Sequence, residues 1–346
     1  MSGNALQDLQ ILSVWASLFT ILACLARILA TRSSSYHIKF TTLAPYSLIF
    51  LLALASRFIV APATMIHENS HGYEYIRSAL GLHGYFFHGS FYYAFFYPIA
   101  RLFGTTHSVV FTSNAVLSAA SCVLIVFAAH AISGTKTVGF AAAIIYTFWP
   151  PVLRLSQSES MFPLGLFFML CSIVASSAAT RRQTISTHLL FFCCLTCLIQ
   201  TRPTLGCFGL LLFSAHVYLS IKRYREHLRS FLPGFFLFLI ATLPWLAFRL
   251  SELSSNGLPS FMAPEEFEVS SLFSAKSNLL LHNDWIPVWF APLATLGFFV
   301  VICRRPAAGI SLLFATATLF IFALGSSATS TVAALRTQSP AHMLLI

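Results

Sequence analysis

The sequence carries very little charge. Only 9% of its 346 residues are Asp, Glu, Lys or Arg, and ten residues are acidic. Soluble folds contain about 25% charged residues, so this deficit excludes a cytosolic enzyme, a disordered tail and a disulfide-rich secreted scaffold. Hydrophobic residues make up 57% of the chain, and its mean hydropathy is +0.80. These values predict that lipid is the solvent for most of the chain.

The predicted loops contain no cysteine, and the chain has no internal repeat. All eight cysteines fall within apolar runs, at Cys24, Cys122, Cys171, Cys193, Cys194, Cys197, Cys207 and Cys303. In an apolar helix a free cysteine behaves as a small packing residue. We therefore expect no loop disulfide, and we interpret the CxxC of Cys194 and Cys197 as packing rather than as a redox or metal motif.

Positive charge exceeds negative charge, with a formal net charge of +10. The basic residues gather in short gaps between apolar runs, as they do in the cytoplasmic loops of multi-pass membrane proteins. The net charge therefore predicts a membrane topology, and we expect no nucleic-acid partner.

Long apolar runs make up most of the sequence. At about 20 residues per crossing, the chain is long enough for about ten transmembrane helices, which predicts one all-α, polytopic membrane domain over residues 1–346. The runs lie at 10–30, 42–61, 107–133, 137–153, 160–180, 185–200, 203–221, 231–250, 286–303 and 307–325.

Alternating the runs across a membrane separates the acidic residues as well as the basic ones. Both termini fall outside in this topology, and Glu226 is the only acidic residue placed inside. The external acidic residues are Asp8, Glu68, Glu74, Glu159, Glu252, Glu265, Glu266, Glu268 and Asp284. Any carboxylate chemistry is therefore expected on the external or lumenal face.

Two stretches outside the apolar runs are long enough to hold a site, residues 62–106 and 251–285. The first is rich in His and Tyr, which favours a position in the membrane interface, with a short amphipathic helix that starts at Asn69 or Ser70 and ends near Gly81. The second is acidic, and it is either a flap that faces the acceptor or a solvated loop.

Three carboxylates and one arginine are predicted at the external boundary. Glu68 and Glu74 lie in the first external loop, Glu159 in a short outer turn, and Arg202 where two apolar runs join. Carboxylates next to hydrocarbon are costly and usually functional. Such a set suits a reaction that needs a general base and an anion clamp, for example displacement of a phosphate-linked leaving group.

Several short segments in order over residues 55–210 carry a family resemblance. They are His67-Glu68-Asn69, Gly72-Tyr73-Glu74-Tyr75-Ile76, Gly84-Tyr85-Phe86, Phe91-Tyr92-Tyr93, Pro98, Leu102-Phe103-Gly104, Ser158-Glu159-Ser160-Met161-Phe162 and Thr201-Arg202-Pro203-Thr204. Together they resemble the C-type (GT-C) integral-membrane glycosyltransferases related to protein O-mannosyltransferases. These enzymes carry an acidic pair, a tyrosine-bearing helix, a glycine-rich turn and a closing Leu-Phe-Gly in the first external loop.

The resemblance implies an inverting transfer of a sugar from a polyprenyl-phosphate carrier to a lipid, glycan or protein acceptor. It assigns Glu68 as the catalytic base and Arg202 as the residue that steadies the departing phosphate. Glu159 would position a substrate or bind a divalent cation, and no other cofactor is implied. The full substrate-binding set is His67, Tyr73, Glu74, His88, Glu159 and Arg202.

Two features depart from the family pattern. His67 stands where the family usually has the Asp of an Asp-Glu pair, which puts a metal-binding or second-acid role at that position in doubt. The loop also follows the second apolar run rather than the first, although its predicted side is the same.

Two other classes of function fit some of the same residues. His67-Glu68-Asn69-Ser70-His71 is a literal HExxH, the zinc-binding pattern of a metalloprotease, but Gly72 follows directly and disfavours the continuous helix that this motif needs. A transporter or flippase of lipid-linked sugars would use the carboxylates as ion sites, yet such proteins commonly show repeats. We expect a bacterial inner membrane rather than the endoplasmic reticulum, because the C-terminus shows no retention signal.

Overall fold

The computed structural model describes eleven helices and the residues around them. The described ranges are 3–33, 40–59, 76–77, 79–80, 91–158, 160–201, 203–223, 228–256, 290–306, 309–310, 312–314 and 316–317. The helices are α1 (Gly3–Ser33), α2 (Phe40–Ile59), α4 (Phe91–Phe103), α5 (His107–Ser133), α6 (Lys136–Thr147), α7 (Pro150–Ser156), α8 (Phe162–Arg182), α9 (Ile185–Thr201), α10 (Pro203–Arg223), α11 (Leu228–Asn256) and α12 (Phe290–Arg304). No strand occurs within these ranges, so the all-α prediction is confirmed there.

Several of these helices can cross a membrane. Four contain segments of sufficient length and hydropathy, namely Asp8–Ala30, His107–Ser133, Phe162–Arg182 and Leu228–Ser251, and the bent pair α6–α7 adds a fifth if it counts as one span. Four more apolar helices are shorter, at Leu43–Ile59, Ile185–Thr201, Phe208–Tyr218 and Pro292–Arg304. The prediction of multiple membrane-capable helices is confirmed, whereas the count of ten stays a prediction.

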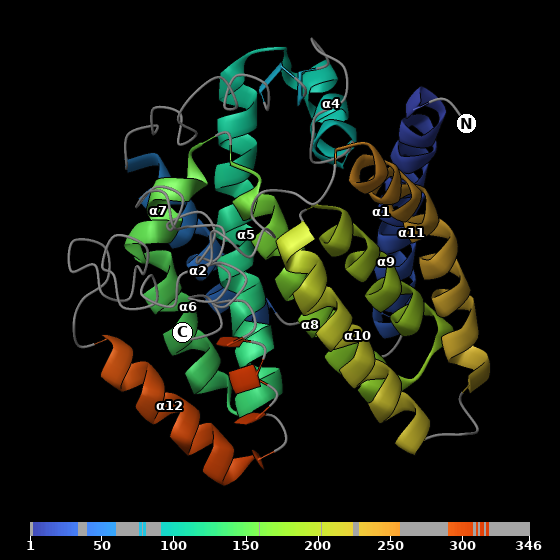
Figure 1. Ribbon diagram of the computed structural model, residues 1–346. Helices are drawn as coiled ribbons and strands as arrows, with labels where there is room; N and C mark the ends of the chain where they lie inside the picture. The colour runs from blue at the N-terminus through green and yellow to red at the C-terminus, as the bar shows by residue number, and fades with distance from the viewer. Residues whose placement is uncertain are drawn as a thin grey trace.

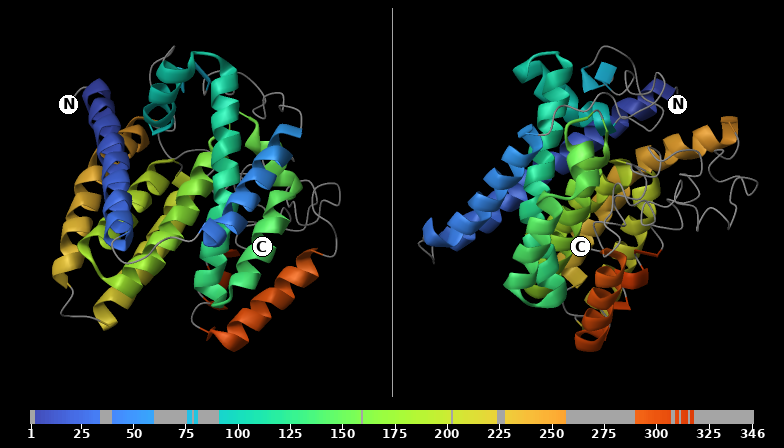
Figure 2. Two further views of the ribbon diagram at one scale, coloured as in Figure 1. Left: turned by 180° about the vertical axis from the view of Figure 1, so that it is seen from behind. Right: turned by 90° about the vertical axis from the view of Figure 1, so that its left-hand side faces the viewer.

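The helices pack around α5, α8 and α9 (Figure 1). α5 lies against α2 and α6 on one side and against α8 on the other, and α9 contacts α1, α8, α10 and α11. α1 and α11 lie side by side at one margin of the bundle, and α12 lies at the other (Figure 2). The most completely buried helix is α9, which explains why its Cys194 and Cys197 pack in the core as predicted.

Phenylalanine supplies much of this core, and one polar side chain inside it, His216, has polar partners on two other helices. His216 of α10 lies among the rings of Phe191, Phe192 and Phe231. Its Nδ1 is 3.0 Å from Ser176 Oγ of α8, and its Nε2 is 3.3 Å from Nδ1 of His188 in α9. Such contacts between helices satisfy polar side chains that hydrocarbon cannot.

The predicted single run 137–153 is two helices with a sharp bend. α6 ends at Thr147, α7 begins at Pro150, and their axes differ by 62°. Pro150 and Pro151 cause the break because proline has no N–H for the helical hydrogen bond and disfavours helical geometry in the residue before it. Trp149, which precedes them, is accordingly extended.

Candidate functional site

All the site residues predicted from the sequence lie outside the described residues. They are His67, Glu68, Tyr73, Glu74, His88, Glu159 and Arg202. The structure does describe the chain on either side of Glu159 and Arg202, and the end of α2 that leads into the first external loop. Those flanking segments show which parts of the predicted site share one end of the bundle.

Arg57, in the last turn of α2, is the central residue of this end. It is fully buried, with 0% of its side chain exposed. Its Nη1 donates to the carbonyl oxygens of Ala53 (3.1 Å) and Thr147 (2.9 Å), and its Nε donates to Ser118 Oγ of α5 (3.1 Å). Nη1 also lies 2.9 Å from Ser56 Oγ. One guanidinium thus joins α2, α5 and α6.

The contact with Thr147 follows from the proline pair. In a continuous helix the carbonyl of Thr147 would accept the N–H of the residue four positions later, and that residue is Pro151. Arg57 supplies the closer replacement donor at 2.9 Å, and Ser56 Oγ makes a longer contact with the same oxygen at 3.5 Å. A buried carbonyl without a partner would cost about 1–3 kcal/mol, so Arg57 stabilises the bend and thereby the direction of α7.

A second proline is compensated in the same way. α4 passes through Pro98, which leaves the carbonyl of Ala94 without its helical partner. Trp15 of α1 donates its Nε1–H to that oxygen at 2.8 Å. Phe91 and Phe95 of α4 also make edge contacts with Phe168 of α8. The last part of the predicted first external loop is therefore fixed between α1 and α8.

The hydroxyl of Tyr93 lies on this part of the loop. Partial burial, reinforced by the neighbouring Tyr97 and Asp8, raises the pKa of Tyr93 above its ordinary value. α1 packs against α4 in this region.

The turn that contains Glu159 is anchored on both sides. Asn114 of α5 donates its Nδ2 hydrogens to the carbonyls of Ser158 (2.7 Å) and Ser160 (3.0 Å). Gln157 Nε2 donates to the backbone carbonyl of Arg57 at 2.6 Å. These bonds connect the turn to the end of α2, where the first external loop begins.

The residues that flank Arg202 approach the start of α8. A Cβ atom on Gly165, in the first turn of α8, would lie 2.6 Å from Leu205 Cδ1 and 3.5 Å from Thr201 Cγ2. Glycine at this position lets the join of α9 and α10 approach the start of α8. Gln200 Nε2 further ties this join to α11 through the carbonyl of Ala241, at 3.0 Å.

The described residues that flank three of the predicted site segments thus lie at one end of the bundle. Sequence reasoning did not find the residue that organises this end, Arg57. The signal was an arginine inside the apolar run 42–61, combined with a Pro-Pro pair in a later run. Hydropathy alone could not connect them, because about ninety residues separate Arg57 from Thr147.

Metal and redox chemistry receive no new support from the part of the chain that the structure describes. Within it, no group of three or more His, Cys, Asp or Glu side chains is placed to hold a metal ion. The seven cysteines whose side chains are described are all free. His67 and His71 of the HExxH pattern lie outside the described residues, so the zinc interpretation stays a prediction.

No protein-family model matches the sequence, and a search of curated proteins also found no match.

Proposed function

We propose that the protein is an inverting membrane glycosyltransferase that moves a sugar from a polyprenyl-phosphate carrier to a lipid, glycan or protein acceptor. One observation supports this proposal. The chain that leads into the Glu68 loop, the turn around Glu159 and the join around Arg202 are tied together at one end of the bundle. A general base and an anion clamp must share such an end to act on one substrate.

In the proposed reaction Glu68 takes the proton of an acceptor hydroxyl. The acceptor oxygen then attacks the anomeric carbon, the bond from that carbon to the phosphate oxygen breaks, and the polyprenyl phosphate leaves with inversion of the sugar. Arg202 binds the phosphate as its charge develops, for which the planar guanidinium is suited. The buried polar cluster around Arg57 positions these segments and touches no substrate.

The proposal includes a membrane arrangement. We place the site at the external or lumenal face of about ten crossings, with the first external loop over residues 62–106 as its catalytic loop. We favour the bacterial inner membrane, where such a transfer would modify the cell envelope.

The proposal is tested by release of free polyprenyl phosphate. Purified full-length protein is incubated with a panel of polyprenyl-phosphate sugars and a membrane extract as acceptor source, and the products are followed by mass spectrometry. We expect release from at least one donor, and the sugar consumed identifies that donor. Absence of release from every donor would count against the proposal. A zinc content near one per chain that is lost in His67→Ala would then support the metalloprotease interpretation.

Replacing Arg202 with Ala is expected to weaken donor binding by about 10- to 150-fold, because a charge-assisted contact with phosphate contributes about 1.5–3 kcal/mol. The measurement is the donor Kd of the variant and of the wild type. Arg154→Ala is the matched control, since it removes an exposed arginine of α7 near the same turn. An unchanged donor affinity in Arg202→Ala would contradict the phosphate-clamp role.

A further inference from the structure

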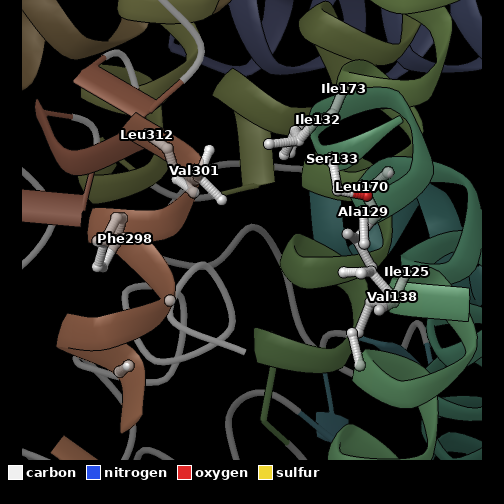
Figure 3. Close-up of a pocket in the computed structure, with 14 residues that line it drawn as sticks. Ile125, Ala129, Ile132, Ser133, Val138, Leu170, Ile173, Phe298, Val301 and Leu312 are labelled. Atoms are coloured by element: carbon white, nitrogen blue, oxygen red, sulfur yellow. The ribbon is translucent and has the colours of Figure 1, made fainter. Parts of the chain in front are cut away.

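A groove separates α12 from the rest of the bundle at the end opposite the candidate site. Two adjoining cavities of about 180 Å³ and 340 Å³ form it, and they share Ile132, Val138, Gly297 and Val301 among their lining residues. Figure 3 shows Val301 and Phe298 of α12 on one side and Ile132 and Ala129 of α5 across from them. The walls are almost entirely apolar.

Gly297 borders open space in this groove. A Cβ atom built on Gly297 meets nothing within 4 Å, although Gly297 lines both cavities. This glycine therefore does not serve close helix packing, unlike Gly139 of α6, whose Cβ would collide with the backbone of Val126. Among the residues that the structure describes, none fills the space beside Gly297.

The groove is basic at one end. Arg304 and Arg305 line it where α12 stops, and Arg305 reaches across to the end of α5, with its Nη1 3.3 Å from the carbonyl of Ile132. None of the helices that line the groove, α5, α6, α8 and α12, contains an Asp or Glu. The two guanidinium groups therefore have no acidic side chain on these helices to neutralise them.

The length of the groove matches one leaflet. At about 1.5 Å per residue, the stretch of α12 from Leu293 to Arg304 is roughly 16 Å long. Half of a typical hydrocarbon core is about 15 Å. An acyl chain that starts at the arginines would extend along α12 to the middle of the membrane.

We propose that this groove binds an anionic glycerophospholipid, with its phosphate headgroup at Arg304 and Arg305 and an acyl chain between α12 and α5–α6. Basic pockets between membrane helices are suited to such headgroups. The lipid fills the space beside Gly297 and connects α12 to the bundle. This inference is independent of the proposed glycosyltransferase activity, because it uses the other end of the molecule and no residue of the candidate site.

Native mass spectrometry of the purified full-length protein tests the proposal, with equal amounts of phosphatidylglycerol and phosphatidylcholine added. We expect a retained lipid adduct with a preference of about tenfold for phosphatidylglycerol, the size that one or two arginine contacts provide. The double variant Arg304→Gln, Arg305→Gln should lose the preference. Arg181→Gln, Arg182→Gln, the equivalent pair at the end of α8, should keep it because neither arginine lines the groove.

The apolar part of the groove is tested separately. Gly297→Phe should lose adducts of both lipids by filling the space, and Gly297→Ala should retain them. The proposal would be overturned if the wild type retained no lipid, or if the Arg304/Arg305 variant kept its full preference for phosphatidylglycerol. Displacement of phosphatidylglycerol by a polyprenyl phosphate at equal concentration would also overturn it. If Gly297→Phe does not fold, the double variant of Arg304 and Arg305 and the control variant of Arg181 and Arg182 still test the proposal.

Discussion

Glu68→Gln should lower the release of polyprenyl phosphate by about 10²- to 10⁴-fold, the contribution typical of general acid–base catalysis. The amide keeps the size and most of the hydrogen-bonding geometry of the carboxylate, but it cannot accept the proton of the acceptor hydroxyl. Donor binding should change little, because the base acts on the acceptor. The measurement is the initial rate of polyprenyl phosphate release at saturating donor, by mass spectrometry.

A control variant separates an effect on catalysis from an effect on expression or folding. Glu226→Gln makes the same chemical change in the only acidic residue predicted on the opposite side of the membrane, and it should retain full activity. Full activity of Glu68→Gln at wild-type expression would remove Glu68 from the mechanism. Loss of activity in both variants would indicate a general effect of removing carboxylates rather than a role in catalysis.

Much of the fold could be predicted from hydropathy alone. The run 107–133 coincides with α5 (His107–Ser133), and 42–61 corresponds to α2 (Phe40–Ile59) within two residues. Such agreement is expected, because a span in lipid must satisfy its own backbone hydrogen bonds as a helix. Hydropathy depends on the local composition of the chain. Helix formation in lipid depends on the same local composition, so the two agree.

Two departures from prediction involve proline. The run 137–153 is bent at Pro150 and Pro151, and α4 is a helix of 13 residues through Pro98 in a stretch that the sequence predicted to be an external loop. Each depends on a donor from a distant helix, Arg57 for the bend and Trp15 for α4. No periodic pattern shows which donor will reach a carbonyl that proline leaves free.

For the candidate site, the structure gives only the neighbours of the predicted residues. Gln157 reaches Arg57 and Thr201 lies against the start of α8, whereas the side of the membrane that these helix ends face stays a prediction. The roles of Glu68, Glu159 and Arg202 remain predictions, because those residues lie outside the described part of the chain.

Because Arg57 joins three helices, we expect its replacement to have a large effect on stability. Arg57→Met should destabilise the protein and lower its apparent Tm by roughly 2–10 °C, the shift expected when a buried carbonyl loses its partner at about 1–3 kcal/mol. Methionine fills a similar volume but offers no donor to Thr147 and none to Ser118. Arg57→Lys should restore only part of the stability, because an ammonium lacks the planar fork that reaches α5 and α6 together.

The measurement is thermal aggregation of purified protein, followed by size-exclusion chromatography. Arg154→Met is the matched control, because it makes the same substitution at an exposed position of α7, and it should leave Tm within about 1 °C of the wild type. If the bend is what Arg57 supports, Arg57→Met should also lower transferase activity at temperatures where the protein is still folded, since α7 leads directly into the turn that contains Glu159. A wild-type Tm in Arg57→Met would mean that the proline bend is stable without its donor, and that another contact directs α7 toward the site.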